Sequence, residues 1–191
     1  MSTDQIIAIS IIAVALVYAI IIYNGLVNLK HAVAKAWSNI DVLLKQRNEE
    51  LPKLVATCQQ YMKYEQETLR QVIEARSQVT SAQQHGSAKE LGRAETQLRS
   101  GLGQLFALAE NYPELQSNQS FQQLQQRISA LENSIADRRE FYNEAVNNNN
   151  VRIEQFPDVL VARFFKFKGA DLLEFEEHEK KDVNIKDLFS Q

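Results

Sequence analysis

Residues 5–29 read QIIAISIIAVALVYAIIIYNGLVNL, contain no charged side chain, and decide the class of fold. About 20 apolar residues, at ~1.5 Å of rise each, cross the hydrocarbon of a bilayer. Residues 5–27 meet that requirement, so the sequence predicts a transmembrane helix after a short extracytoplasmic N-terminus at residues 1–4. Tyr18 and Tyr23 lie toward its far end, where amphipathic rings settle at an interface.

A cleaved signal peptide is the alternative interpretation of this stretch. Signal peptides begin with cationic residues and end with a small-residue cleavage site. Here Asp4 precedes the apolar run, and the A-x-A triplet at Ala13–Ala15 falls in its middle. Cys58 lies too far downstream to serve as a lipid-attachment site. We therefore expect a retained anchor.

The flanking charges predict how the anchor is oriented. No Lys or Arg precedes the apolar run, whereas Lys30, Lys35, Lys45 and Arg47 follow it. Because cytoplasmic flanks carry the excess of cations, we expect the N-terminus outside and residues 30–191 in the cytoplasm.

The remainder of the chain is predicted to be helical throughout. Gly (6) and Pro (3) are scarce among 191 residues, which favours long helices. The net charge of −3 gives no indication of a nucleic-acid partner. Apolar residues at spacings of three and four, with a heptad stagger in the last segment, predict helices over residues 3–50, 52–82, 88–110 and 120–154. Pro52 is interpreted as a helix boundary. The predicted class is all-α: the transmembrane helix continues into an antiparallel bundle of three to four long helices over residues 28–155.

Residues 156–191 differ in character from the predicted bundle. Phe156-Pro157 ends the last helix, an aromatic and basic knot extends to Lys168, and an acidic tail follows. The knot could fold back and seal the end of the bundle, or dock on the membrane surface or on a neighbouring copy. Small residues at a spacing of four also allow close helix association in lipid. The predicted oligomer contacts are Ala15, Ala19, Phe164, Phe165 and Phe167.

On each predicted helix, the apolar residues at spacings of three and four form a stripe along one face. Four charged residues fall on or beside these stripes: Asp41, Glu65, Arg76 and Arg138. A ligand site or proton relay is one interpretation. We favour ion pairs that fix helix register, because charges are tolerated in a core only when they are paired. The prediction is that Arg76 or Arg138 pairs with Glu65 or Asp41.

No catalytic, cofactor or metal site is predicted. The three histidines, His31, His85 and His178, are far apart and match no metal-ligand spacing. The sequence contains neither a glycine-rich phosphate loop nor a nucleophile elbow. Cys58 lies on an apolar stripe, which indicates a small buried hydrophobe rather than a nucleophile.

Several motifs in their order and spacing resemble the LemA family. They are Tyr23-Asn24-Gly25-Leu26-Val27, Ala36-Trp37-Ser38-Asn39-Ile40-Asp41-Val42, Leu51-Pro52-Lys53-Leu54-Val55, Glu74-Ala75-Arg76, Asn111-Tyr112-Pro113-Glu114-Leu115, Leu131-Glu132-Asn133, Arg138-Arg139, Tyr142-Asn143, Phe156-Pro157 and Phe165-Lys166-Phe167. The chain departs from the family at Tyr64, where histidine is usual. It departs again at Lys166, where glycine is usual, which argues against a tight turn. The acidic extension after Glu174 is matched to no motif of the family.

The resemblance implies a bacterial inner-membrane protein with its N-terminus outside, a cytoplasmic antiparallel helical bundle and no established enzymatic activity. Our first hypothesis is a membrane-anchored scaffold that contacts lipid, self-assembles into homo-oligomers and organises or remodels the membrane. The alternative is an adaptor that binds a membrane protease or another envelope protein. No cofactor is expected in either case.

Overall fold

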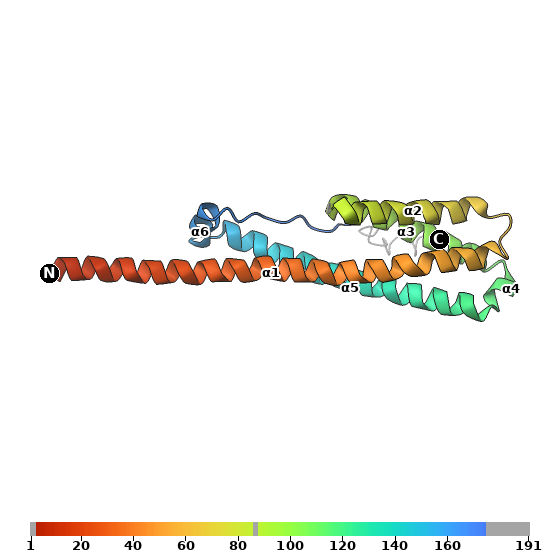
Figure 1. Cartoon of the computed structure of the whole chain (residues 1–191), viewed down its shortest axis with the longest axis horizontal. Coiled ribbons are helices and arrows are strands. Elements are labelled where there is room, and N and C mark those ends of the chain that lie inside the picture. Colours follow the sequence, from red (N-terminus) through yellow and green to blue (C-terminus); the bar gives the residue numbers. More distant parts are fainter. Residues whose placement is uncertain (1–2, 86–87, 175–191) are drawn as a thin grey trace, which may run out of the picture. The chain divides into compact units, whose positions relative to one another are not determined.

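The computed structural model describes residues 3–85 and 88–174, which are helical with no strand among them (Figure 1). The helices are α1 (Thr3–Gln59), α2 (Gln66–His85), α3 (Ala88–Ala109), α4 (Pro113–Gln116), α5 (Gln119–Glu154) and α6 (Asp158–Phe164). The predicted all-α class with one long apolar N-terminal helix is confirmed. Most of the predicted acidic tail lies outside the described residues.

The helix ends agree with the sequence prediction except around Pro52. The prediction of a boundary there is wrong, because Pro52 lies inside α1, which continues to Gln59. The chain turns instead over residues 60–65, which contain neither Gly nor Pro. Met62 anchors this turn, since its side chain is buried and its backbone N–H donates to the carbonyl of Cys58 at 2.8 Å.

A side chain from α2 explains how α1 tolerates this proline. Proline lacks the N–H that would bond the carbonyl four residues earlier, which here belongs to Asn48. Arg76 supplies the missing donor, because its Nε lies 3.0 Å from the Asn48 carbonyl oxygen. The sequence pattern cannot show this compensation, since the two residues are far apart along the chain.

The described chain divides into two compact units. Unit 1 comprises Met1–Ile40 with Arg138–Leu172, and unit 2 comprises Asp41–Asp137 with Leu173–Gln191. In unit 2, α2 and α3 pack against each other as a hairpin (Figure 1). The fully buried side chains of unit 2 come from α1 to α5 and are mainly aliphatic: Leu44, Leu51, Leu54, Leu91, Leu98, Leu105, Leu115, Phe121 and Ile128.

Unit 1 has a smaller core. Ile22 and Leu26 of α1 and Ala162 of α6 form a buried cluster, which Ile153, Val161 and Phe167 partly cover. Further along α1, the Trp37 ring packs against the Tyr142 ring with a centroid distance of 5.3 Å. These contacts hold α6 and the end of α5 against α1, from the last turns of the apolar segment to Trp37.

Side chains of α5 hold the extended segment after α6. The Asn150 side chain accepts from the Ala170 N–H at 3.0 Å and donates to the Ala170 carbonyl at 2.9 Å. The Tyr142 hydroxyl donates to the Asp171 carbonyl at 2.9 Å. The asparagine run at residues 147–150, a poor helix former, therefore remains helical and binds the backbone of a neighbouring segment.

The first part of α1 is apolar and exposed. It is the one helix among the described residues that is long and apolar enough to cross a membrane, with a mean hydropathy of 2.9 in its most apolar window. Its large side chains from Ile6 to Ile21 are 52–70% exposed. In water, each large aliphatic side chain left exposed would forgo roughly 1.5–3 kcal/mol of burial free energy. This segment therefore fits membrane association.

Candidate functional site

A charge triad connects three helices inside unit 2. Arg47 of α1 is 1% exposed and Glu95 of α3 is 3% exposed. The guanidinium binds Glu95 through both Nη atoms, at 2.9 Å and 2.5 Å, and Nη1 also donates to Glu132 of α5 at 2.6 Å. Such two-pronged geometry is characteristic of strong arginine–carboxylate pairs. The triad fixes the register of α1, α3 and α5.

Burial and charge act against each other in this triad. Burial alone would lower the pKa of Arg47, but Glu95 and then Glu132 outweigh it and raise that pKa. Burial raises the pKa of Glu95 in spite of the attraction of Arg47. The guanidinium therefore stays charged, and it is hydrogen-bonded to two carboxylates. The arrangement has the character of a structural ion pair and offers no unpaired acid or base for catalysis.

The two acidic residues predicted for the polar core have other partners. Asp41 accepts from Lys45 Nζ at 2.6 Å and from Gln83 Nε2 at 2.6 Å. The hydrogen bond from Lys45 lowers the pKa of Asp41 and outweighs the opposing effect of burial. Glu65 lies within 3.5 Å of the Tyr112 hydroxyl, which donates to it. Both residues are half-buried.

The two arginines predicted for the polar core also have partners other than Glu65 and Asp41. Arg76 is half-buried and donates to the Asn48 carbonyl. Arg138 is exposed, with its guanidinium 5.6 Å from the centre of the Phe141 ring. In the described contacts, Arg76 binds a backbone carbonyl and Arg138 faces an aromatic ring, whereas Arg47 supplies the buried ion pair.

Sequence reasoning missed Arg47, Glu95 and Glu132, although the sequence carries a signal for them. Arg47 occupies a stripe position between Leu44 and Leu51, where the spacing of three and four requires an apolar residue. Glu95 interrupts the stripe of α3 in the same way. These positions mark Arg47 and Glu95 as interior charges, but the pattern along one helix does not identify the partner on another helix.

Cys58 is fully buried and free. Burial raises the pKa of its thiol to about 12. Because the thiolate is the nucleophile, this residue is a packed hydrophobe, as its place on the apolar stripe predicts. Among the described residues, His, Cys, Asp and Glu form no group of three that could hold a metal ion.

The aromatic knot packs in part against α1. The Tyr23 ring lies 4.7 Å from the Phe165 ring and 5.8 Å from the Phe167 ring, measured between centroids. The Phe164 ring contacts Phe165 at 4.9 Å yet remains 79% exposed. The knot therefore folds back through Phe165 and Phe167 and presents Phe164 outward, and its docking on the membrane surface or on a neighbouring copy stays a prediction.

Lys166 forms a tight turn in spite of its side chain. Its φ is 58°, in the left-handed region that favours glycine. The Phe167 N–H closes the turn by donating to the Ala162 carbonyl at 2.9 Å. The expectation that Lys166 argues against a tight turn is wrong, because Lys166 adopts the left-handed conformation and the turn forms.

The two small residues predicted for helix association lie in the apolar segment. Ala15 is exposed and Ala19 is half-buried. Their spacing of four places them on one face of α1. Association of copies through this face stays a prediction.

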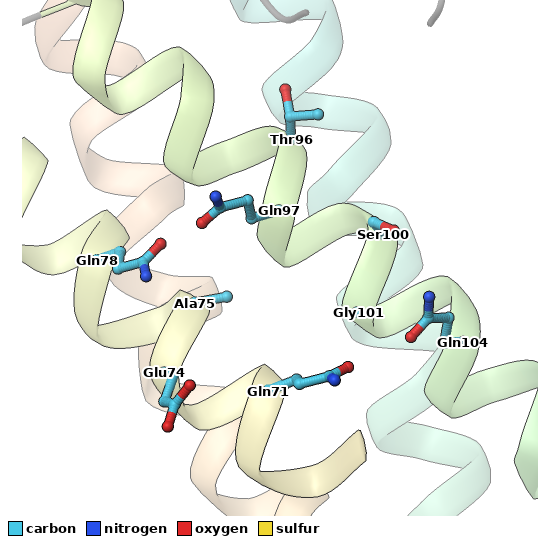
Figure 2. Close-up of a pocket in the computed structure, with 9 residues that line it drawn as sticks. All are labelled: Gln71, Glu74, Ala75, Gln78, Thr96, Gln97, Ser100, Gly101 and Gln104. Carbon is cyan, nitrogen blue, oxygen red and sulfur yellow. The ribbon is translucent and has the colours of Figure 1, made fainter. Parts of the chain in front are cut away.

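A shallow groove of about 400 Å³ runs along the α2–α3 hairpin. Figure 2 shows that glutamine side chains from both helices surround it, including Gln71 and Gln78 of α2 and Gln97 and Gln104 of α3. Gly101 and Ala75 keep its floor low. The groove offers hydrogen-bond donors and acceptors, with Glu74 as the one charged side chain in its lining.

The fold and these contacts define the class of this protein. It is a helical protein whose exposed apolar helix fits membrane association and whose interior charges are paired between helices. The chain belongs to the LemA family, whose family model matches residues 36–186. The match extends past Glu174, so part of the acidic tail falls within the family, contrary to the expectation that it has no counterpart.

Magnetosome proteins from two bacteria are similar in sequence to this chain. Magnetosome proteins MamQ 1 and MamQ 2 of Paramagnetospirillum magneticum are each 33% identical over 100 residues, covering 52% of this chain and 36% of each relative. Magnetosome protein MamQ of Magnetospirillum gryphiswaldense is 30% identical over 95 residues, covering 50% of this chain and 34% of the relative. The chain thus aligns with about a third of the length of these curated relatives.

Proposed function

We propose that this protein is a non-enzymatic, membrane-anchored scaffold that self-assembles into homo-oligomers and organises or remodels a bacterial inner membrane. The observation that carries the proposal is the unburied apolar surface of unit 1. It consists of the 52–70% exposed segment Ile6–Ile21 together with the outward rings of Phe156 and Phe164, which are 76% and 79% exposed. A monomer in water gains nothing from so much apolar surface, whereas lipid and neighbouring copies can cover it.

The test is the mass of the full-length protein in detergent, measured by light scattering that separates protein from detergent. A discrete multiple of the monomer supports the scaffold, and a monomer at all concentrations refutes it. Substituting Ala15→Ile and Ala19→Ile together blocks close helix approach, so the variant is expected to lose that multiple. Ala13→Ile is the control, because Ala13 is exposed and lies on another face of the segment.

The proposal includes an orientation, with the N-terminus outside and the helical bundle in the cytoplasm. The cations after the apolar segment support it. In a Cys58→Ala background, Thr3→Cys should react with a membrane-impermeant maleimide on intact spheroplasts, and Lys63→Cys should react only after lysis. The reverse pattern would show the opposite orientation.

The second candidate is an adaptor for a membrane protease or another envelope protein. The groove on the α2–α3 hairpin favours it, because glutamine side chains from both helices line it and offer amide groups to a partner (Figure 2). A photocrosslinker in place of Gln97 should trap a membrane partner, whereas one in place of Phe141, exposed on α5, should not. Recovery of copies of this chain alone would count against the adaptor.

A further inference from the structure

Cations gather at a pocket just past the apolar segment of α1. The pocket holds about 510 Å³ and is lined by Tyr23, Lys30 and His31 of α1 and by the segment 165–168 that follows α6. Its lining contains three lysines, Lys30, Lys166 and Lys168, and no carboxylate. These residues all belong to unit 1. The pocket therefore concentrates positive charge in a concave, half-aromatic site.

The fold holds these cations in place. Lys166 adopts a φ of 58°, a left-handed conformation that non-glycine residues rarely adopt. The Lys168 carbonyl accepts from Asn149 Nδ2 at 3.4 Å, and Asn149 is itself buried. The Tyr23 ring packs on both neighbouring phenylalanines. The lysine heads are thus carried by a backbone that is fixed against α1 and α5.

The position of the pocket corresponds to the headgroup level of a bilayer. Lys30 is the first cation after the apolar run and lies roughly 12 Å beyond Ile22 at ~1.5 Å per residue. Tyr23, in the pocket wall, is of the residue type that settles at a membrane interface. Cations at this depth meet lipid phosphates rather than hydrocarbon.

The outer face of α6 points to the same surface. Leu160 and Phe164 are four residues apart within α6, so they share one face, and they are 61% and 79% exposed, while Phe156 before the helix is 76% exposed. On the opposite face, Ala162 is buried against Ile22 and Leu26 of α1. An apolar aromatic face flanked by cations is typical of a segment that lies in the interface.

We propose that this pocket binds the phosphate of an anionic phospholipid headgroup while the Leu160–Phe164 face of α6 enters the adjoining leaflet. The inference rests on the proposed membrane anchoring and adds a lipid class and a site to it. The lysines neutralise the phosphate, the aromatic wall contacts the glycerol and upper acyl chains, and α6 fixes the depth of the end of the anchor. Besides the apolar segment of α1, the chain thereby has a second contact with the bilayer, and this contact selects anionic lipids.

The first experiment measures lipid selectivity of the full-length protein in nanodiscs of phosphatidylcholine. Spin-labelled phosphatidylglycerol and spin-labelled phosphatidylcholine are compared by the fraction that becomes motionally restricted. The wild type is expected to prefer the anionic lipid. The Lys30→Gln/Lys166→Gln/Lys168→Gln variant should lose at least about fivefold of that preference, since one interfacial cation contributes about that factor.

The matched control removes three exposed lysines outside the pocket, in Lys35→Gln/Lys63→Gln/Lys89→Gln. This variant has the same change in net charge and should keep the preference. An equal loss in both variants would overturn the proposal in favour of general surface electrostatics. Displacement of the spin-labelled lipid by inorganic phosphate at constant ionic strength would also overturn it, because the pocket would then be a site for a free anion.

The second experiment locates α6 relative to the bilayer. In a Trp37→Phe background, Phe164→Trp provides a single fluorescent reporter, and Phe141→Trp provides a control at another exposed phenylalanine. Brominated lipids should quench the reporter at 164 and leave the reporter at 141 bright. An unquenched reporter at 164 would refute insertion of α6. Neither readout depends on oligomer mass, so failure here is distinguishable from failure of the scaffold.

Discussion

The backbone of Gly92 in α3 lies directly against the backbone carbonyl of Glu174. A Cβ placed on Gly92 would overlap that carbonyl oxygen, and the next residue back, Leu173, is buried at 1% exposure. Glycine is therefore required here by close approach of two backbones and not by an unusual φ. The contact fixes the last described residues of the chain on unit 2.

Substituting Gly92→Ala is expected to displace this C-terminal contact. Overpacking typically costs about 1–3 kcal/mol, which exceeds the ~0.5–1 kcal/mol that alanine usually adds inside a helix. The full-length protein in detergent should show a lower urea midpoint and faster proteolysis near Leu173.

Gly103→Ala is the matched control within the same helix. A Cβ at Gly103 meets nothing within 4 Å, and the residue is exposed. Only the helix-propensity gain remains, so stability should rise by about 0.5–1 kcal/mol. Equal effects of the two substitutions would contradict the assigned contact.

Local patterns predicted most of the helical architecture. The uncharged run at residues 5–29 defines the apolar half of α1, and the period of three to four identifies α3 and α5 to within one or two residues. Both signals depend only on neighbours along the chain, so they survive folding unchanged.

Local sequence patterns failed where a residue is stabilised by a partner on another helix. Pro52 looks like a boundary until Arg76 of another helix supplies the missing donor. Arg47 looks like a surface cation following the anchor until Glu95 and Glu132 are brought to it. In each case the partner lies at least 24 residues away, so nothing in the local pattern identifies it.

The Cys58 thiol should make stability fall at alkaline pH. Its pKa is about 12 in the fold against an ordinary value of 9.0. Between these values the folded chain keeps a proton that the unfolded chain loses, so unfolding becomes easier as pH rises. Above pH 9.0 the cost approaches about 1.4 kcal/mol per pH unit.

Cys58→Ala provides the reference for this measurement. Other groups titrate in the same range, so the quantity compared is the pH slope of the unfolding free energy in the wild type and in the variant. The wild-type slope should be steeper above pH 9.0 and equal below it. Parallel slopes throughout, or rapid alkylation of the native thiol, would show that the thiol is accessible.

Removing the guanidinium from the buried triad should be among the most damaging single changes. Arg47→Met leaves Glu95 buried without its partner, and breaking such a pair costs about 3–5 kcal/mol. Replacing all three residues, as Arg47→Met/Glu95→Leu/Glu132→Leu, removes all the charges of the triad and should restore the stability of the wild type or exceed it. Chemical denaturation followed by far-UV circular dichroism measures both.

The control for the triad is an exposed ion-pair cluster on α2. Arg70 binds Glu67 and Glu74 on the surface of one helix. Surface pairs are screened by solvent, so Arg70→Met should leave the unfolding midpoint unchanged. If Arg47→Met also leaves the unfolding midpoint unchanged, the triad does not fix the helix register.

Arg76 and Pro52 should be energetically coupled through the Asn48 carbonyl. Arg76→Met leaves that half-buried carbonyl without a donor, at a cost of about 1–3 kcal/mol. In a Pro52→Ala background the alanine N–H can take the carbonyl, so the same substitution should cost less by about 0.5–3 kcal/mol. Pro113→Ala is the control background, because Pro113 stands in the first turn of α4, where no helical N–H is needed. An Arg76→Met penalty that is identical in all three backgrounds would mean that Arg76 does not substitute for the hydrogen bond that Pro52 removes.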